Sequence, residues 1–133
     1  MAASASGSSV RTPGQTFALV FGVVYLIIGV VGFLVTGFDD FAANSTEKLI
    51  LFEINPLHNI VHIAIGAMWV AGARTVESAK QVNMIIGVAY LLFALLGIFG
   101  LLDSLINNNG GDVGLHLVSG AAALYFATAG SRS

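Results

Sequence analysis

The sequence contains no cysteine and very little charge. Of its 133 residues, two are proline and 9% are charged, with five basic and seven acidic residues beside three histidines. Without thiols the chain can form no disulfide, thiolate metal site, iron–sulfur cluster or covalently attached c-type haem. Five scattered basic residues also argue against nucleic-acid binding, since phosphate recognition needs a clustered basic face. Any metal would therefore be held by nitrogen and oxygen.

Apolar residues dominate the chain instead. Hydrophobic residues make up 56% of it and the mean hydropathy is +0.89, whereas roughly 25% of an average soluble domain is charged. Four windows lack charge, and each is close to the ~20 residues that span a ~30 Å hydrocarbon core. We therefore predict an all-α integral membrane protein, an up-down-up-down bundle of four transmembrane helices forming one domain over residues 16–130. The windows are residues 15–37, 55–73, 82–102 and 113–131.

Residues 1–15 precede the main part of the first apolar window. They are rich in Ser, Ala and Gly and contain one arginine, a composition that predicts a disordered cytoplasmic tail. The first window could also be read as a signal peptide. Its apolar run from Phe17 to Thr36 is longer than the usual ~7–15 residues of such a peptide, so we expect a retained helix.

Lysine and arginine predict the orientation, because these residues collect in the cytoplasmic loops of membrane proteins. In a four-span arrangement Arg11, Arg74, Lys80 and Arg132 fall on one side, and only Lys48 falls on the other. Both termini are therefore predicted to be cytoplasmic.

Two short patterns occur twice. Gly-Val-Val-Tyr-Leu at residues 22–26 matches Gly-Val-Ala-Tyr-Leu at residues 87–91, and His-x-x-x-Gly-Ala begins at both His62 and His116. Since the first and third helices run in the same direction, these matches predict two parallel helix-hairpin repeats about an axis along the membrane normal. The two histidines would then lie at equivalent depth.

The stretch from Asn55 to His62 contains two of the three histidines. Its first residue can cap a helix, and the proline that follows fits the first turn, where no N–H is needed. A spacing of four residues puts His58 and His62 on one stripe of that helix. Tyr25 and Tyr90 are expected to hydrogen-bond within the bundle, whereas Trp69 is interpreted as an interfacial residue.

The last helix contains a similar pair, with Asp112 as its expected cap and His116 one turn deeper. Because the second and fourth helices lie diagonally across an up-down-up-down bundle, these side chains could meet those of the second helix near the outer end. Three imidazoles and one carboxylate suit Zn, Fe, Mn, Cu or Ni, and the same groups could relay protons. The predicted metal ligands are His58, His62, Asp112 and His116.

Two other interpretations use the same residues. His62 and His116 alone could be axial ligands of a b-type haem, with Gly66 and Gly120 leaving room for the macrocycle, although such helices pack tightly. Alternatively the polar groups only join helices, each contact contributing roughly 0.6 kcal/mol, in a structural or accessory membrane subunit without a ligand. Its partners would be the bilayer, a second copy or another membrane protein. No phosphate loop, nucleophile triad or carboxylate pair is visible, so no catalytic site is predicted.

The histidine motifs carry a family resemblance. With Asn-Pro-Leu-His-Asn-x-x-His-x-x-x-Gly at residues 55–66 and Asp-x-x-x-His-x-x-x-Gly at residues 112–120, the chain resembles small bacterial four-helix membrane proteins known as a domain of unknown function, number 4383. The resemblance covers about Gln15 to Ala129. It implies a multi-pass protein of the bacterial cytoplasmic (inner) membrane, and it supplies no reaction.

Overall fold

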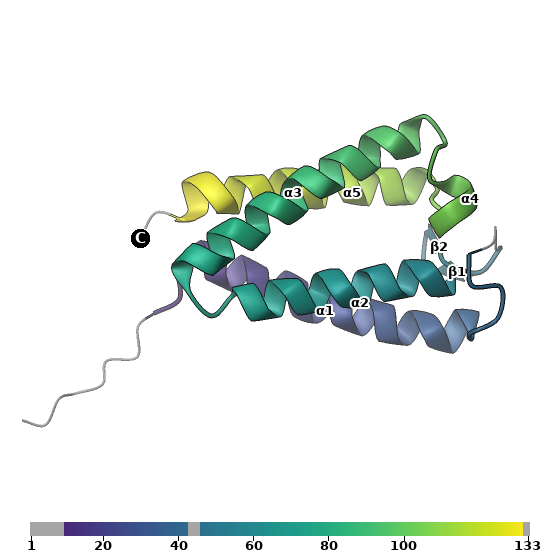
Figure 1. The fold of residues 1–133 in the computed structure, drawn as a ribbon, viewed down its shortest axis with the longest axis horizontal. Coiled ribbons are helices and arrows are strands. Elements are labelled where there is room, and N and C mark those ends of the chain that lie inside the picture. The colour runs from purple at the N-terminus through teal and green to yellow at the C-terminus, as the bar shows by residue number, and fades with distance from the viewer. Residues whose placement is uncertain (1–9, 43–45, 132–133) are drawn as a thin grey trace, which may run out of the picture.

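A computed structural model describes residues 10–42 and 46–131 (Figure 1). Within these residues the chain is mostly helical, which confirms the predicted all-α architecture of four long helices. The long helices are α1 (Pro13–Thr36), α2 (Pro56–Gly72), α3 (Val76–Ile98) and α5 (Gly110–Thr128). The short elements are β1 (Lys48–Leu49), β2 (Phe52–Glu53), α4 (Asp103–Ile106) and the 3₁₀ helix η1 (Ala129–Ser131).

The long helices form two hairpins. α1 packs along α2 in the N-terminal hairpin and α3 along α5 in the C-terminal hairpin, and the contacts between the hairpins are fewer. The end where α1 begins and α5 finishes is called the terminal end below, and the opposite end, with β1, β2 and α4, is called the loop end. α2 and α3 lie close together at the terminal end and diverge toward the loop end (Figure 1).

Local capping explains where α1 and α3 begin. The hydroxyl of Thr12 accepts a hydrogen bond from the backbone N–H of Gln15, and the Gln15 side chain accepts one from the N–H of Thr12. This capping box, with proline in the first turn, satisfies N–H groups that have no partner within the helix. Residues 13–15, assigned to the tail from composition, therefore belong to α1, while residues 1–9 of that tail lie outside the described residues. A second box at Thr75 starts α3 before the predicted window.

The start of α2 agrees with the sequence prediction, and the start of α5 does not. Asn55 caps α2 by accepting a hydrogen bond of 2.8 Å from the N–H of His58. In α5 the cap is Asn109, whose side chain accepts from the N–H of Asp112 at 3.1 Å. Asp112 is the third residue of that helix, and its carboxylate accepts from the N–H of Asn109 at 3.0 Å. The prediction that Asp112 caps α5 was wrong, because the capping box begins three residues earlier, at Asn109.

The sequence repeat is also a repeat of helix packing. A Cβ atom built on Gly22 would lie 2.9 Å from the carbonyl oxygen of Gly66, and one built on Gly87 would lie 3.1 Å from that of Gly120. These are equivalent positions in the two hairpins. Glycine at each of them lets two helix backbones approach closely, which is the usual basis of helix association in lipid.

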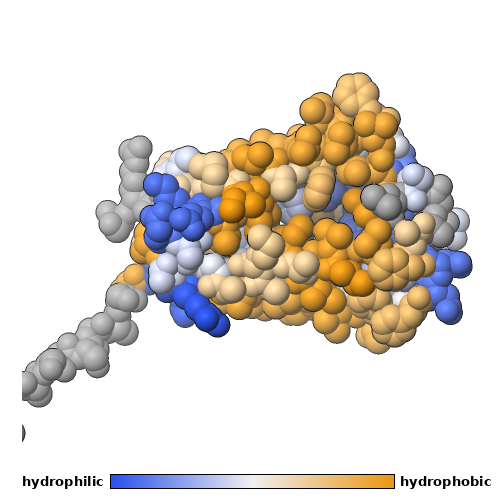
Figure 2. All heavy atoms as spheres, in the orientation of Figure 1, coloured by the Kyte–Doolittle hydropathy of each residue, from blue (hydrophilic) through white to orange (hydrophobic). Residues whose placement is uncertain are grey.

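Many large apolar side chains of the long helices are exposed, whereas those of a water-soluble protein are mostly inside. The outward face of the long helices is apolar (Figure 2), with Leu34 84% and Ile98 61% exposed. Helices α1 and α3 are long and apolar enough to cross a membrane. The largest fully buried side chains in the described part of the chain all carry a polar atom: Trp69, Tyr90, His58, Asn55, Asn83, Asp112 and Ser119.

Candidate functional site

His58 and Asp112 meet inside the loop end. They come from α2 and α5, and the distance from His58 Nε2 to Asp112 Oδ1 is 3.9 Å, with side chains that are only 2% and 1% exposed. This distance is too long for a hydrogen bond. It is short enough for an ion pair when the ring is protonated and the carboxylate is ionised.

His62 lies one turn deeper on α2. Its ring is 4.7 Å from that of His58, centroid to centroid, in an edge-on arrangement. It also stacks on the ring of Tyr25 from α1, at 5.0 Å. The spacing of four residues therefore brings the two imidazoles of α2 together, as the sequence predicts, and a tyrosine that repeats in the sequence completes the contact.

His116 makes the equivalent contact in the C-terminal hairpin. Its ring lies 5.0 Å from that of Tyr90, and the two tyrosines lie 5.8 Å apart. Successive contacts thus connect His62, Tyr25, Tyr90 and His116, here called the ring row, across all four long helices. Both histidines are buried in the bundle, but the described contacts join them through the tyrosines and not directly.

Several polar atoms around the ring row have no hydrogen-bond partner among the described residues. They are both ring nitrogens of His58 and of His62, Nδ1 of His116 and the hydroxyl of Tyr90, all of them buried. Burying one such group unsatisfied costs about 1–3 kcal/mol. Six of these atoms lie in one region, and native proteins rarely leave buried polar groups unpaired.

Other polar groups approach these atoms without completing a hydrogen bond. Backbone groups of Glu53 and Ile106 lie near the ring of His58, and the hydroxyls of Tyr25 and Tyr90 lie near each other, but none of these approaches has hydrogen-bond geometry. The hydroxyl of Tyr25 instead donates to Ser119 at 3.2 Å. Small movements could therefore pair some of these groups, whereas the ring of His62 packs against the rings of Tyr25 and His58.

Two further polar residues of this region were missed in the sequence. Ser119, the partner of Tyr25, is 1% exposed, and Asn108 is 5% exposed. Both atoms of the Asn108 side-chain amide are buried without a hydrogen-bond partner among the described residues. Ser119 could have been noticed as a serine inside an apolar window. Asn108 stands in a run of three asparagines, which the sequence indicates only as a turn.

The predicted metal ligands are only partly brought together. His58 contacts Asp112 and His62, whereas the ring contacts of His116 are with Tyr90 and Phe93. Across residues 10–42 and 46–131, no group of three or more His, Cys, Asp or Glu side chains is placed to hold a metal ion. A four-ligand metal site therefore stays a prediction.

The two glycines that follow the histidines lie against neighbouring helices. A Cβ atom on Gly66 would lie 2.9 Å from the Leu26 side chain, and one on Gly120 would lie 3.0 Å from that of Leu91. Neighbouring helices thus fill the space beside both glycines. Both glycines make close helix contacts, and haem binding by His62 and His116 stays a prediction.

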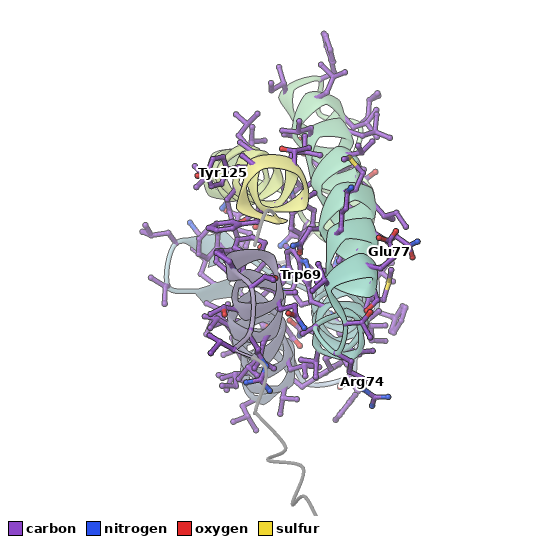
Figure 3. All side chains as sticks on the ribbon, turned by 90° about the vertical axis from the view of Figure 1, so that its left-hand side faces the viewer. Trp69, Arg74, Glu77 and Tyr125 are labelled. Carbon is purple, nitrogen blue, oxygen red and sulfur yellow. The ribbon has the colours of Figure 1, made fainter. Side chains whose placement is uncertain are left out.

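Trp69 packs against the two tyrosines of the ring row, on the side that faces the terminal end. Its ring meets those of Tyr25 and Tyr90 edge-on, at 5.2 and 6.0 Å. The interfacial interpretation of Trp69 was wrong: the side chain is fully buried, and its Nε1 donates to Asn83 at 3.0 Å. Seen from the terminal end, Trp69 points into the bundle while Tyr125 and Arg74 lie at its outside (Figure 3).

Comparison with known proteins gives one match. Residues 15–129 match the model of a family described as Domain of unknown function (DUF4383), which confirms the resemblance inferred from the histidine motifs. No curated protein and no solved structure matches the chain.

Proposed function

The chain belongs to the DUF4383 family, and we propose that it is a four-span protein of the bacterial cytoplasmic membrane whose buried histidines and Asp112 bind and release protons. The observation that carries the proposal is the group of six buried, unpartnered polar atoms on His58, His62, Tyr90 and His116.

The distribution of apolar surface supports the membrane part of the proposal. Helices α1 and α3 are long and apolar enough to span a bilayer. Helices α2 and α5 have 17 and 19 residues, which rise about 26 and about 29 Å, close to the ~30 Å of a hydrocarbon core. Polar side chains inside and apolar side chains outside suit a lipid environment, where water cannot solvate an outward polar group.

The charges at the two ends support the orientation. Arg11, Arg74 and Lys80 belong to the terminal end, and Lys48 belongs to the loop end. The positive-inside rule then puts the terminal end in the cytoplasm and the loop end outside. The histidines and Asp112 would lie nearer the outer surface.

The arrangement of the histidines favours protons over a metal. A neutral imidazole has one nitrogen that accepts a proton and one that donates, so neighbouring rings can pass a proton between them. A proton held on Nε2 of His58 would face Oδ1 of Asp112, whose negative charge stabilises the imidazolium. His62 is the next acceptor along α2.

Nitrogen-15 NMR of histidine-labelled protein in lipid nanodiscs tests the proposal. The chain has three histidines, and all of them belong to the proposed site, so every signal reports on it. At least one ring, with His58 beside Asp112 the first candidate, should change protonation between about pH 3 and 8, a range that extends below the ordinary one for histidine because burial disfavours a charged ring. Three rings that keep one protonation state throughout this range would contradict the proposal.

Asp112→Asn sharpens the same measurement. His58 should then take up its proton at a lower pH than in the wild-type protein, because the carboxylate that stabilises the imidazolium is gone. Asp103→Asn is the matched control, since it removes the same charge from an exposed position at the loop end and should leave the titration of His58 unchanged. Equal effects of the two substitutions would contradict the pairing of His58 with Asp112.

A further inference from the structure

A groove opens on the outside of α1 at the terminal end, close to the end of α5. Its volume is about 470 Å³, within the ~300–1,000 Å³ of ligand sites. The residues of α1 that line it run from Pro13 to Phe21 and have the three- and four-residue spacing of one helix face. The helix rises about 12 Å over this stretch, so the groove leads from the end of the bundle along α1.

Phenylalanine rings line this groove. Phe17 stacks on Phe21 and on Phe126 of α5, with ring centroids 4.2 and 4.7 Å apart. Figure 3 looks onto this end of the bundle, where α1 and α5 lie beside each other. The ring of Trp69 meets those of Phe17 and Phe21 edge-on, at 5.8 Å each. These apolar walls suit a hydrocarbon chain that runs along α1.

Arg11 gives the groove a positive charge at its outer end. Among the described residues that line the groove it is the one with a charge, and it is exposed, just before α1 begins. The ion pairs of the described residues join Lys48 to Glu53 and His58 to Asp112, so neither pair neutralises Arg11. The first turn of α1 contains no acidic residue, and the positive end of the helix dipole adds to the charge of the guanidinium. This end of the groove therefore favours an anion.

We propose that the groove binds one anionic phospholipid, with its phosphate at Arg11 and an acyl chain along Phe17 and Phe21. Arginine forms charge-assisted hydrogen bonds with phosphate oxygens, and basic pockets between transmembrane helices suit anionic head groups. The length agrees, because about 12 Å of helix is close to half of a ~30 Å hydrocarbon core, the depth of one leaflet. A zwitterionic lipid would bring a second cation to Arg11, and an apolar protein helix would leave Arg11 without an anion. The proposal rests on the transmembrane placement in the proposed function, but not on proton binding.

The single tryptophan provides the measurement. Trp69 is the only tryptophan of the chain and contacts Phe17 and Phe21, so bromine atoms on a chain in the groove should quench its fluorescence. The full chain would be placed in phosphatidylcholine nanodiscs that contain increasing amounts of phosphatidylglycerol or phosphatidylcholine brominated in the upper half of its acyl chains. The brominated phosphatidylglycerol should be preferred about fivefold, the contribution of one basic side chain near anionic lipid.

Two pairs of variants locate the lipid. Arg11→Gln should lose the preference for phosphatidylglycerol, whereas Arg74→Gln removes a charge from the same end but outside the groove and should keep the preference. Val20→Phe fills the groove and should reduce the quenching by either brominated lipid at equal content. Ile27→Phe enlarges an exposed side chain of α1 outside the groove, and its quenching should equal that of the wild type.

Equal quenching by the two brominated lipids in the wild-type protein would overturn the proposal, because the groove would then make only an ordinary lipid contact. An equal loss of preference in the two arginine variants would overturn it too, since the charge of the whole end would then attract the lipid. So would a Val20→Phe variant that is quenched as the wild type is. A chain that does not enter nanodiscs would instead contradict the transmembrane placement, and the histidine titration is a separate measurement, so the two proposals can fail separately.

Discussion

The two ends of the bundle differ in how many of their buried polar side chains are hydrogen-bonded. At the terminal end, Trp69 donates to Asn83, Asn83 donates to the carbonyl of Gly14, and Gln15 donates to the carbonyl of Ala73, at 3.0, 3.1 and 3.1 Å. Toward the loop end, the unpartnered histidine nitrogens and the hydroxyl of Tyr90 have no such bonds to the rest of the described chain.

The terminal end shows that this chain can satisfy buried polar side chains by packing them against one another. Each bond of the terminal end joins separate helices or a helix and a turn, so the network fixes how the hairpins pack. Unpaired groups at the other end cost stability. Their concentration in one region is therefore the main physical argument that this region has a function.

The largest effect on stability is expected from removing a hydrogen-bonded side chain of the terminal end. Trp69→Ala removes a fully buried ring and leaves Asn83 without its donor, so the free energy of unfolding should fall by about 3–5 kcal/mol. Far-ultraviolet circular dichroism during denaturation in mixed micelles measures the change. Tyr125→Ala, at an exposed position of α5, should cost less than about 0.5 kcal/mol. Similar losses for both variants would show that Trp69 does not organise the core.

A smaller effect on stability, of opposite sign, is expected from removing unpartnered polar atoms toward the loop end. His62→Phe keeps an aromatic ring against Tyr25 and removes two buried nitrogens without partners, so the protein should become more stable by about 1 kcal/mol. Asn83→Leu, its counterpart at the terminal end, should destabilise by about 2 kcal/mol because Trp69 loses its acceptor. If both substitutions destabilise equally, His62 serves to join helices, and the structural-subunit interpretation gains support.

The smallest effect is expected from added metal. Saturating Zn should leave the unfolding midpoint of the wild-type protein unchanged, because His116 is joined to the other predicted ligands through tyrosines. A site formed by His58, His62, Asp112 and His116 would instead stabilise the protein by about 2.7 kcal/mol at a hundredfold excess of Zn over the dissociation constant. That increment, abolished by His62→Ala or His116→Ala, would favour the metal over the proton.

Features decided by neighbouring residues could be predicted from the sequence. Asn55 caps α2 and the proline after it occupies the first turn, since capping depends on residues within one turn. The spacing of four residues likewise places His58 beside His62. The cap of α5 was misassigned to Asp112, the last charged residue before the apolar window. The helix begins earlier, at the capping box of Asn109.

Features decided by contacts between distant segments could not be predicted. Trp69 lies near a helix end, as an interfacial residue does, but Asn83 from the next helix gives its N–H a buried acceptor. The repeated tyrosines were visible in the sequence. Their position between His62 and His116 depends on how the two hairpins pack against each other.

The sequence by itself determined the helices, their pairing into two similar hairpins and the stripe of histidines on α2, because periodicity, capping and small-residue spacing act over a few residues. Only the tertiary structure decided which buried groups are satisfied. That outcome depends on where side chains from four helices meet, and no local pattern encodes the distance between residues that far apart in the chain. The same packing places Tyr25 and Tyr90 between His62 and His116.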